Sequence, residues 1–130
     1  MIVVDASVLV TALGDDGVDG RRVRRRLAGE RMTAPELVDI EVTSVLRRLT
    51  NAGKLAPDRA KQALGDLVSL RIARVSHRPL LERCWELREN VSPYDAVYVA
   101  LAELLGVPLL TADERLVAAP GVRCSFEVLS

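Results

Sequence analysis

Short apolar runs alternate with longer amphipathic segments along most of the chain. The β-branched run at residues 2–4 predicts a buried strand, and residues 31–34 predict a second one. Three further strands are predicted at residues 71–75, 107–110 and 122–128. Short strands that are apolar throughout are typical of parallel sheets covered by helices on both faces.

Between these strands, apolar residues recur at helical spacing. Helices are predicted at residues 8–13, 21–27, 35–51, 57–68, 79–88 and 93–105, with one short helix before the last strand. Pro35 is expected at a first helical position, where its missing N–H costs nothing. Ser92 is expected as an N-cap with Pro93 behind it, and Gly106 ends that helix. Because residues 96–105 are apolar on nearly every side, we expect this helix to be central and buried.

This alternation predicts an α/β fold in which a central, mostly parallel sheet is flanked by helices on both faces. The chain has 130 residues, of which 49% are hydrophobic, and this is enough apolar material for one core. No internal repeat, low-complexity tract or linker divides it. We therefore expect a single domain over residues 1–130.

Charge and cysteine content limit the kinds of partner and the cellular compartment that we expect. The 18 basic and 18 acidic side chains cancel, so any attraction to a polyanion has to come from local patches. Cys84 and Cys124 are far apart and have only His77 as a companion, which favours neither a disulfide framework nor a zinc site. The N-terminus lacks a basic leader region, and no apolar run approaches the ~18 residues of a membrane span. A cytoplasmic protein without a membrane segment is expected.

Four carboxylates stand at positions where an acid needs an explanation. Asp5 and Asp113 each follow a predicted strand, and ligands of open α/β sheets bind at the carboxyl ends of strands. Glu41 falls inside the apolar stripe of its predicted helix, where an unpartnered charge is costly. Asp95 begins the predicted central helix, where the chain enters the protein interior.

Taken alone, each acid also has a structural explanation. Asp5 or Asp113 could cap the helix that follows it. Asp95 could complement a helix dipole, and Glu41 could pair with a buried arginine. Together the four would repel one another and resist ionisation, and a bound divalent cation resolves that conflict. Oxygen-only ligands suit magnesium or manganese, with one or two ions activating water for attack on phosphorus.

Four segments carry a resemblance that covers essentially the whole chain. They are residues 3–10 (VVDASVLV), 35–42 (PELVDIEV), 94–103 (YDAVYVALAE) and 110–116 (LTADERL). In this order and spacing the sequence resembles the PIN-domain ribonucleases, specifically the VapC toxins of type II toxin–antitoxin systems. The resemblance implies a PIN-like fold.

The resemblance also implies the site. It places the catalytic and metal-binding acidic quartet on Asp5, Glu41, Asp95 and Asp113. Supporting hydroxyls fall on Ser7 and Thr111, which could orient metal-bound water or a carboxylate, or could be ordinary turn and cap hydroxyls. The family often has asparagine three positions after its glutamate, and this chain departs from that pattern with Ser44.

By resemblance, the expected activity is Mg²⁺-dependent endoribonuclease cleavage of structured RNA such as transfer or ribosomal RNA, with Mn²⁺ able to substitute. A VapB-type antitoxin is expected to hold the toxin in check, and a homodimer is expected. The arginine-rich segment 21–26 could contact RNA phosphates or the antitoxin, although a solvated face is the favoured interpretation.

Two other classes of acidic α/β protein fit the sequence less well. An aspartate-nucleophile phosphatase needs a second acid two residues after the first, where this chain has Ser7. A phosphoacceptor receiver needs adjacent acids after its first strand and a late lysine, and no lysine follows Lys61. A catalytically inactive PIN-fold binding module stays open because fold does not fix function, although the quartet is complete. So does a housekeeping RNA-processing nuclease without an antitoxin.

Overall fold

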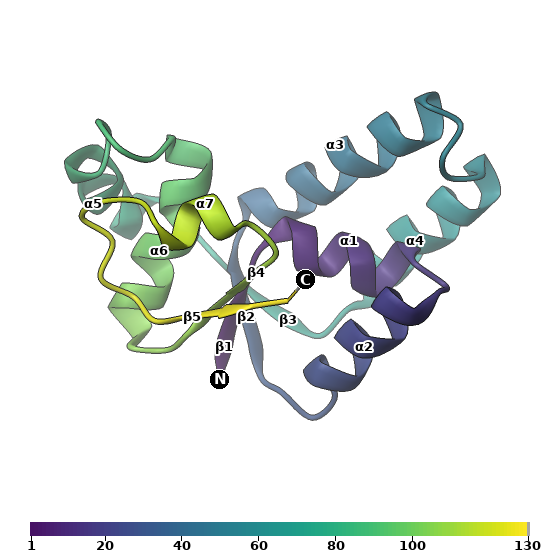
Figure 1. The fold of residues 1–130 in the computed structure, drawn as a ribbon, viewed down its shortest axis with the longest axis horizontal. Helices are drawn as coiled ribbons and strands as arrows, with labels where there is room; N and C mark the ends of the chain where they lie inside the picture. The colour runs from purple at the N-terminus through teal and green to yellow at the C-terminus, as the bar shows by residue number, and fades with distance from the viewer. Residues whose placement is uncertain (130) are drawn as a thin grey trace.

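The computed structural model describes residues 1–129 and contains a five-stranded, all-parallel sheet with strand order β3-β2-β1-β4-β5 (Figure 1). The strands are β1 (Ile2–Val4), β2 (Met32–Pro35), β3 (Ile72–Val75), β4 (Leu109–Thr111) and β5 (Phe126–Val128). The central strand β1 is buried along its whole length. The predicted α/β class and parallel sheet are therefore confirmed.

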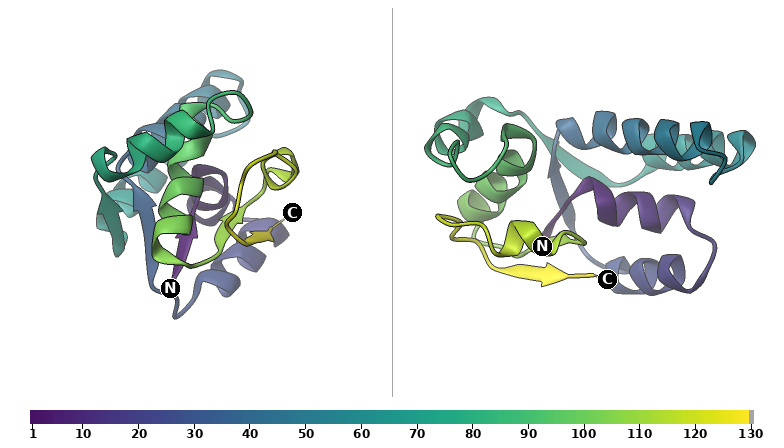
Figure 2. Two further views of the ribbon diagram at one scale, coloured as in Figure 1. Left: turned by 90° about the vertical axis from the view of Figure 1, so that its left-hand side faces the viewer. Right: turned by 45° about the horizontal axis from the view of Figure 1, so that its top comes forward.

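Helices cover both faces of this sheet. They are α1 (Ala6–Gly14), α2 (Val18–Leu27), α3 (Leu37–Asn51), α4 (Pro57–Ser69), α5 (Leu81–Glu86), α6 (Pro93–Leu105) and α7 (Glu114–Val117), with a 3-10 turn η1 (Arg78–Leu80) before α5. Helix α1 packs with α2, α3 and α4 on one side, whereas α6 packs along β1 and β2 on the other (Figure 2). Among the described residues, no helix combines the length and hydropathy needed to cross a bilayer.

Helix α6 is the buried helix that its composition predicts. Every residue from Ala96 to Ala102 is buried. Ser92 caps its start by accepting a hydrogen bond from the Asp95 N–H at 3.3 Å, and Pro93 occupies the first turn. The helix ends at Gly106, whose φ of 67° lies in the left-handed region that glycine enters without a steric penalty.

The prediction for Pro35 is wrong. Pro35 is the last residue of β2, opposite Val75 of β3, and α3 begins only at Leu37. The pairing of β2 with β1 ends at Thr33, so the missing N–H of Pro35 falls beyond that ladder and breaks no bond to β1. The chain then turns through Glu36, whose N–H donates to the Val75 carbonyl at 2.9 Å.

Other boundaries also shift. The predicted helix over 79–88 is split into η1 and the shorter α5. The predicted strand over 122–128 is reduced to β5, which pairs with β4 from Phe126 onward. The Ser125 carbonyl still accepts the Leu109 N–H of β4 at 3.0 Å, but the chain before it bonds to helix α6. The Arg123 N–H donates to Glu103 at 2.7 Å, and Arg83 joins Glu103 to the Gly121 carbonyl.

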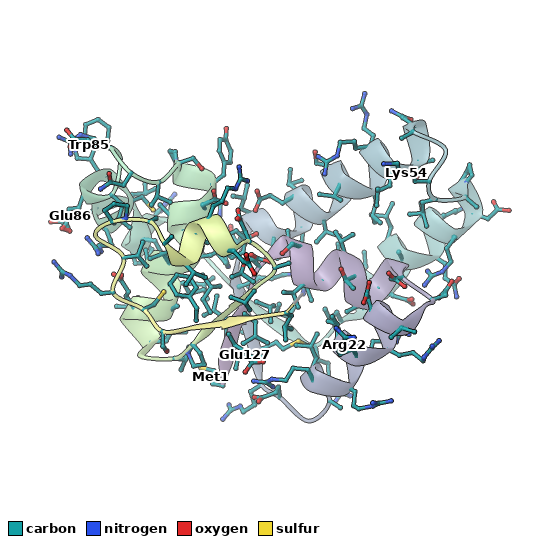
Figure 3. The ribbon with its side chains drawn as sticks, in the orientation of Figure 1. Met1, Arg22, Lys54, Trp85, Glu86 and Glu127 are labelled. Atoms are coloured by element: carbon teal, nitrogen blue, oxygen red, sulfur yellow. The ribbon has the colours of Figure 1, made fainter. Side chains whose placement is uncertain are left out.

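Two arginines of the 21–26 cluster anchor α2 to its neighbours, which the solvated-face interpretation did not anticipate. Arg24 donates to the carbonyls of Ala12 at 3.0 Å and Asp15 at 2.7 Å. Arg26 pairs at 2.5 Å with Glu127 of β5, which is labelled in Figure 3. The arginine content of this helix is thus partly explained by packing within the chain.

Candidate active site

The end of β1 places Asp5 at the N-terminus of α1, where one carboxylate serves two purposes. Its Oδ1 accepts a hydrogen bond from the Val8 N–H at 3.2 Å, so Asp5 is the N-cap of this helix. The Ser7 hydroxyl donates to the same oxygen. Asp5 is only 9% exposed, yet its side chain lines a pocket. The capping explanation and the site prediction are therefore compatible.

The neighbouring strand β4 ends beside β1 and delivers Asp113. The Thr111 hydroxyl, which is fully buried, accepts the Asp113 N–H at 3.0 Å, and Ser7 accepts the Ala112 N–H at 3.2 Å. Asp113 then caps α7 by accepting the Arg115 N–H at 2.9 Å. The two predicted hydroxyls thus join the carboxyl ends of adjacent strands and fix the two aspartates relative to each other.

Helix α3 supplies Glu41, and the structure explains why this acid can lie in an apolar stripe. The Tyr98 hydroxyl of α6 donates to Glu41 Oε1 at 2.6 Å, and Tyr98 is only 2% exposed. Among the described residues, no arginine or lysine forms an ion pair with Glu41. Its partner is therefore a tyrosine and not the buried arginine considered from the sequence.

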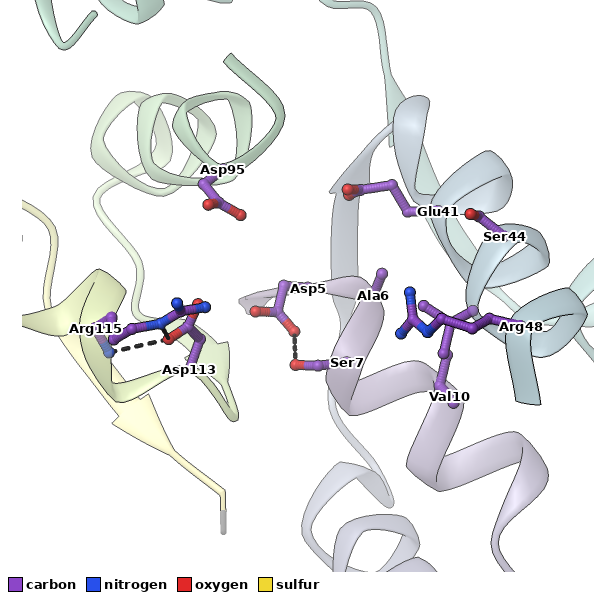
Figure 4. Close-up of a pocket in the computed structure, with 11 residues that line it drawn as sticks. Asp5, Ala6, Ser7, Val10, Glu41, Ser44, Arg48, Asp95, Asp113 and Arg115 are labelled. Carbon is purple, nitrogen blue, oxygen red and sulfur yellow. Dashed lines mark hydrogen bonds and ion pairs between the residues drawn. The ribbon is translucent and has the colours of Figure 1, made fainter. Parts of the chain in front are cut away.

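Helix α6 supplies the fourth carboxylate from its first turn. Asp95 is more exposed than Asp5, and the Ser92 hydroxyl donates to its Oδ2 at 3.4 Å. Figure 4 shows Asp95 and Glu41 approaching Asp5 from opposite walls, with Asp113 beside it. Four separate segments of the chain therefore bring their acids to one place.

These acids line an open pocket of about 600 Å³ at the carboxyl edge of the sheet. Its walls contain all four predicted carboxylates and Ser7, whereas Thr111 lies behind them. The full lining comprises Asp5, Ala6, Ser7, Val10, Glu41, Ser44, Val45, Arg48, Asp95, Asp113 and Arg115.

Sequence reasoning missed Arg48, Arg115 and Tyr98 as parts of this site. Arg48 follows Glu41 by seven residues, which is two helical turns, so helical spacing could have placed it on the same face. Tyr98 follows Asp95 by three residues, but it stands in a helix that is apolar all round. No periodicity distinguishes its hydroxyl from the packing residues beside it.

The site resists carrying its full negative charge. Burial raises the pKa of Asp5, although hydrogen bonds from Ser7 and Thr111 oppose this rise. Burial also raises the pKa of Glu41, against the hydrogen bond from Tyr98, and the charges of Asp95 and Asp5 add to the rise. The pKa of Asp95 is raised by burial and by Asp113. Burial thus disfavours the charged form of all three acids, and neighbouring carboxylates add to this effect at Glu41 and Asp95, so a bound cation would favour their ionisation.

The donor set fits a hard divalent cation. The pocket offers carboxylate and hydroxyl oxygens, and no cysteine or histidine lines it. Among the described residues, no three acidic, histidine or cysteine side chains are grouped closely enough to ligate one ion together directly. Magnesium is usually held by one or two carboxylates and keeps several waters, so the remaining acids would act through those waters.

Comparison with known proteins places this arrangement in a family. The PIN domain family matches residues 2–122. Two proteins of Mycobacterium tuberculosis are similar over nearly their whole length. Ribonuclease VapC1 is 44% identical over 98% of this chain and 96% of its own, and Ribonuclease VapC9 is 43% identical over 99% and 98%. The chain is a PIN domain of the VapC family.

Solved structures share the fold of this PIN domain at low sequence identity. Mycobacterium tuberculosis VapC20, described as a sarcin–ricin loop cleaving toxin, superposes with a TM-score of 0.71 at 19% identity and covers 95% of this chain and 97% of its own. The DNA-bound VapBC structure from Salmonella typhimurium gives a TM-score of 0.70 at 18% identity over 99% and 98%. These likenesses confirm the PIN-like fold expected from the sequence.

Proposed function

We propose that this PIN domain is a magnesium-dependent endoribonuclease and acts as the toxin of a VapBC-type pair. Asp5, Glu41, Asp95 and Asp113 are its catalytic and metal-binding residues, and Mn²⁺ substitutes for Mg²⁺. The observation that carries the proposal is the convergence of four carboxylates from four segments on one pocket, three of them with raised pKa values.

The protein's own groups prepare this site before any substrate arrives. Ser7 and Thr111 fix Asp5 against the β4 edge, and Tyr98 fixes Glu41. When bound, the divalent cation supplies Lewis-acid activation of water and neutralises negative charge on the phosphate. The carboxylates hold it and orient the waters, and the open pocket admits a polymer rather than enclosing a small molecule.

Structured RNA, either transfer or ribosomal, is the proposed substrate. The similar proteins named Ribonuclease VapC support RNA cleavage, and a VapC20 structure described as a sarcin–ricin loop cleaving toxin supports a structured target. Structures of VapBC complexes support a VapB-type antitoxin as the partner. A cytoplasmic homodimer remains the expected state of the toxin.

Co-purification tests the toxin assignment. Co-expression with a VapB-type gene from the same operon is expected to give a stable complex that leaves bulk transfer and ribosomal RNA intact. The chain freed of antitoxin is expected to cleave one of them in magnesium, and adding the antitoxin back should stop cleavage. Free chain that is folded and loaded with magnesium but leaves both RNAs intact would contradict the proposal.

A further inference from the structure

Arg48 differs from the arginines whose side chains form hydrogen bonds with the rest of the protein. Arg24, Arg59 and Arg83, for example, each donate to backbone carbonyls and so serve packing. Arg48 is exposed, and its side chain forms no hydrogen bond or ion pair with any described residue. Figure 4 shows its guanidinium directed into the acidic pocket from α3. Its N–H donors are therefore available to a ligand in that pocket.

Arg115 stands on the opposite wall, beside Asp113. Its side chain is 93% exposed, and its ion pair with Asp113 is long, at 3.4 Å. An exposed pair of this kind contributes little to stability. Asp113 keeps its better hydrogen bond, which comes from the Arg115 main-chain N–H at 2.9 Å. The guanidinium can therefore leave Asp113 for another anion at small cost.

Both arginines border the carboxylates without neutralising Asp5 or Glu41. Four carboxylates repel an approaching polyanion, and a cation bound at their centre neutralises only part of their negative charge. Guanidinium groups bind phosphate through two parallel hydrogen bonds, which position a strand as well as attract it. Arginines on opposite walls suit the phosphates on either side of the one that reacts.

We propose that Arg48 and Arg115 each bind a backbone phosphate of the RNA, so that the strand crosses the pocket from α3 to α7 with the scissile phosphate over Asp5. This inference rests on the proposed function, because it assumes that RNA is cleaved at this site. It assigns the two arginines to substrate binding and leaves the chemistry to the acids.

The chain offers a matched control on the same helix. Arg47 is also an exposed arginine of α3, but it does not line the pocket. Arg48→Gln and Arg47→Gln therefore make the same change in net charge, one inside the site and one outside it. Arg48→Lys keeps the charge and removes the planar guanidinium, which separates phosphate geometry from simple attraction.

The experiment measures cleavage in magnesium of a stem–loop RNA oligonucleotide with a mapped cleavage site in its single-stranded loop, at several salt concentrations. Arg48→Gln is expected to lower kcat/KM by about tenfold or more, mainly through KM, because a charge-assisted hydrogen bond is lost. The slope of log kcat/KM against log salt should fall by about 0.7, the value for one phosphate contact on a single strand. Arg115→Gln should behave similarly, and Arg48→Lys should recover only part of the loss.

Arg47→Gln should match the wild type in both kcat/KM and slope. Equal kinetics for Arg48→Gln and Arg47→Gln, with a wild type that cleaves, would overturn the inference while leaving the proposed function intact. A wild type that cleaves no RNA would instead refute the proposed function, and the inference with it. Thermal melting of every variant establishes that a loss of activity is not a loss of fold.

Discussion

At the scale of single residues, the contact between Tyr98 and Glu41 explains how an acid is kept in a mostly apolar setting. Burial raises the pKa of Glu41, and the Tyr98 hydroxyl offsets part of that rise by donating a hydrogen bond to the charged carboxylate. The same contact fixes the direction of the Glu41 side chain. Tyr98 is thus a positioning residue for a proposed metal ligand, although it does not line the pocket itself.

Tyr98→Phe is expected to lower kcat by about tenfold with little change in KM, because Glu41 loses its orienting donor at a cost of about 1–2 kcal/mol. Higher magnesium should recover part of the loss if the defect lies in holding the ion. Tyr94→Phe is the matched control, since Tyr94 is a 62% exposed tyrosine of the same helix. A destabilised Tyr98→Phe protein with wild-type kcat at every magnesium concentration would show that the contact is only structural.

At the scale of elements, α3 carries Glu41 and Arg48, so the start of this helix affects the site. Glu36, the N-cap residue of α3, makes no side-chain capping hydrogen bond. Instead the Leu37 N–H donates to His77 Nε2 at 2.9 Å. The cap is therefore supplied from a segment forty residues away in the sequence. Such a cap leaves no local signal, which is one reason why the predicted start of this helix at Pro35 was wrong.

His77→Ala is expected to cost about 1 kcal/mol, as loss of an N-cap acceptor does, and to lower Tm by a few degrees. His77→Gln retains an acceptor at the end of its side chain and should recover part of this loss. Thermal melting in chelator measures both effects without a contribution from bound metal. An alanine variant that melts with the wild type would show that the helix start is fixed by other contacts.

The sequence predicted elements best where local chemistry determined them. Helix α6 (Pro93–Leu105) has its N-cap, its first-turn proline and the glycine that ends it within or directly beside its own segment, and its bounds were predicted correctly. The last strand was predicted too long because Arg123 bonds to Glu103 of α6, a contact that no local pattern reveals. Asp5 and Asp113 could be grouped because strand ends meet at one edge, whereas Glu41 and Asp95 were singled out by their places in apolar helices and joined to them by the family resemblance. Arg48 and Tyr98 required the packing of α3 and α6.

At the scale of the whole molecule, the acidic site costs the metal-free fold some stability. The raised pKa values mean that the folded state holds these protons more tightly than the unfolded state does. The resulting cost is fully present above the folded-state pKa values and is relieved as pH falls through them. Other ion pairs, such as Arg83–Glu103, weaken on acidification, so a comparison between variants isolates the site.

Glu41→Gln keeps an acceptor for Tyr98 and removes one charge. In chelator at neutral pH it is expected to melt a few degrees above the wild type, and the gap should close as pH falls through the raised pKa of Glu41. Millimolar magnesium should stabilise the wild type more than the variant, because a ligand of the folded state raises Tm according to its affinity. A large loss in Glu41→Gln, equal with and without metal, would make Glu41 a structural residue.

The central claim is that four carboxylates from four segments form one metal-dependent centre for RNA cleavage. Its most direct test is the single-turnover rate of RNA cleavage by the wild type and by Asp5→Asn, measured in excess chelator and across a magnesium titration. The wild type should be inactive in chelator and should gain activity with magnesium until it saturates. Asp5→Asn should stay orders of magnitude slower at every concentration while its circular dichroism remains native-like. Equal cleavage by the wild type in chelator and in magnesium would contradict the claim.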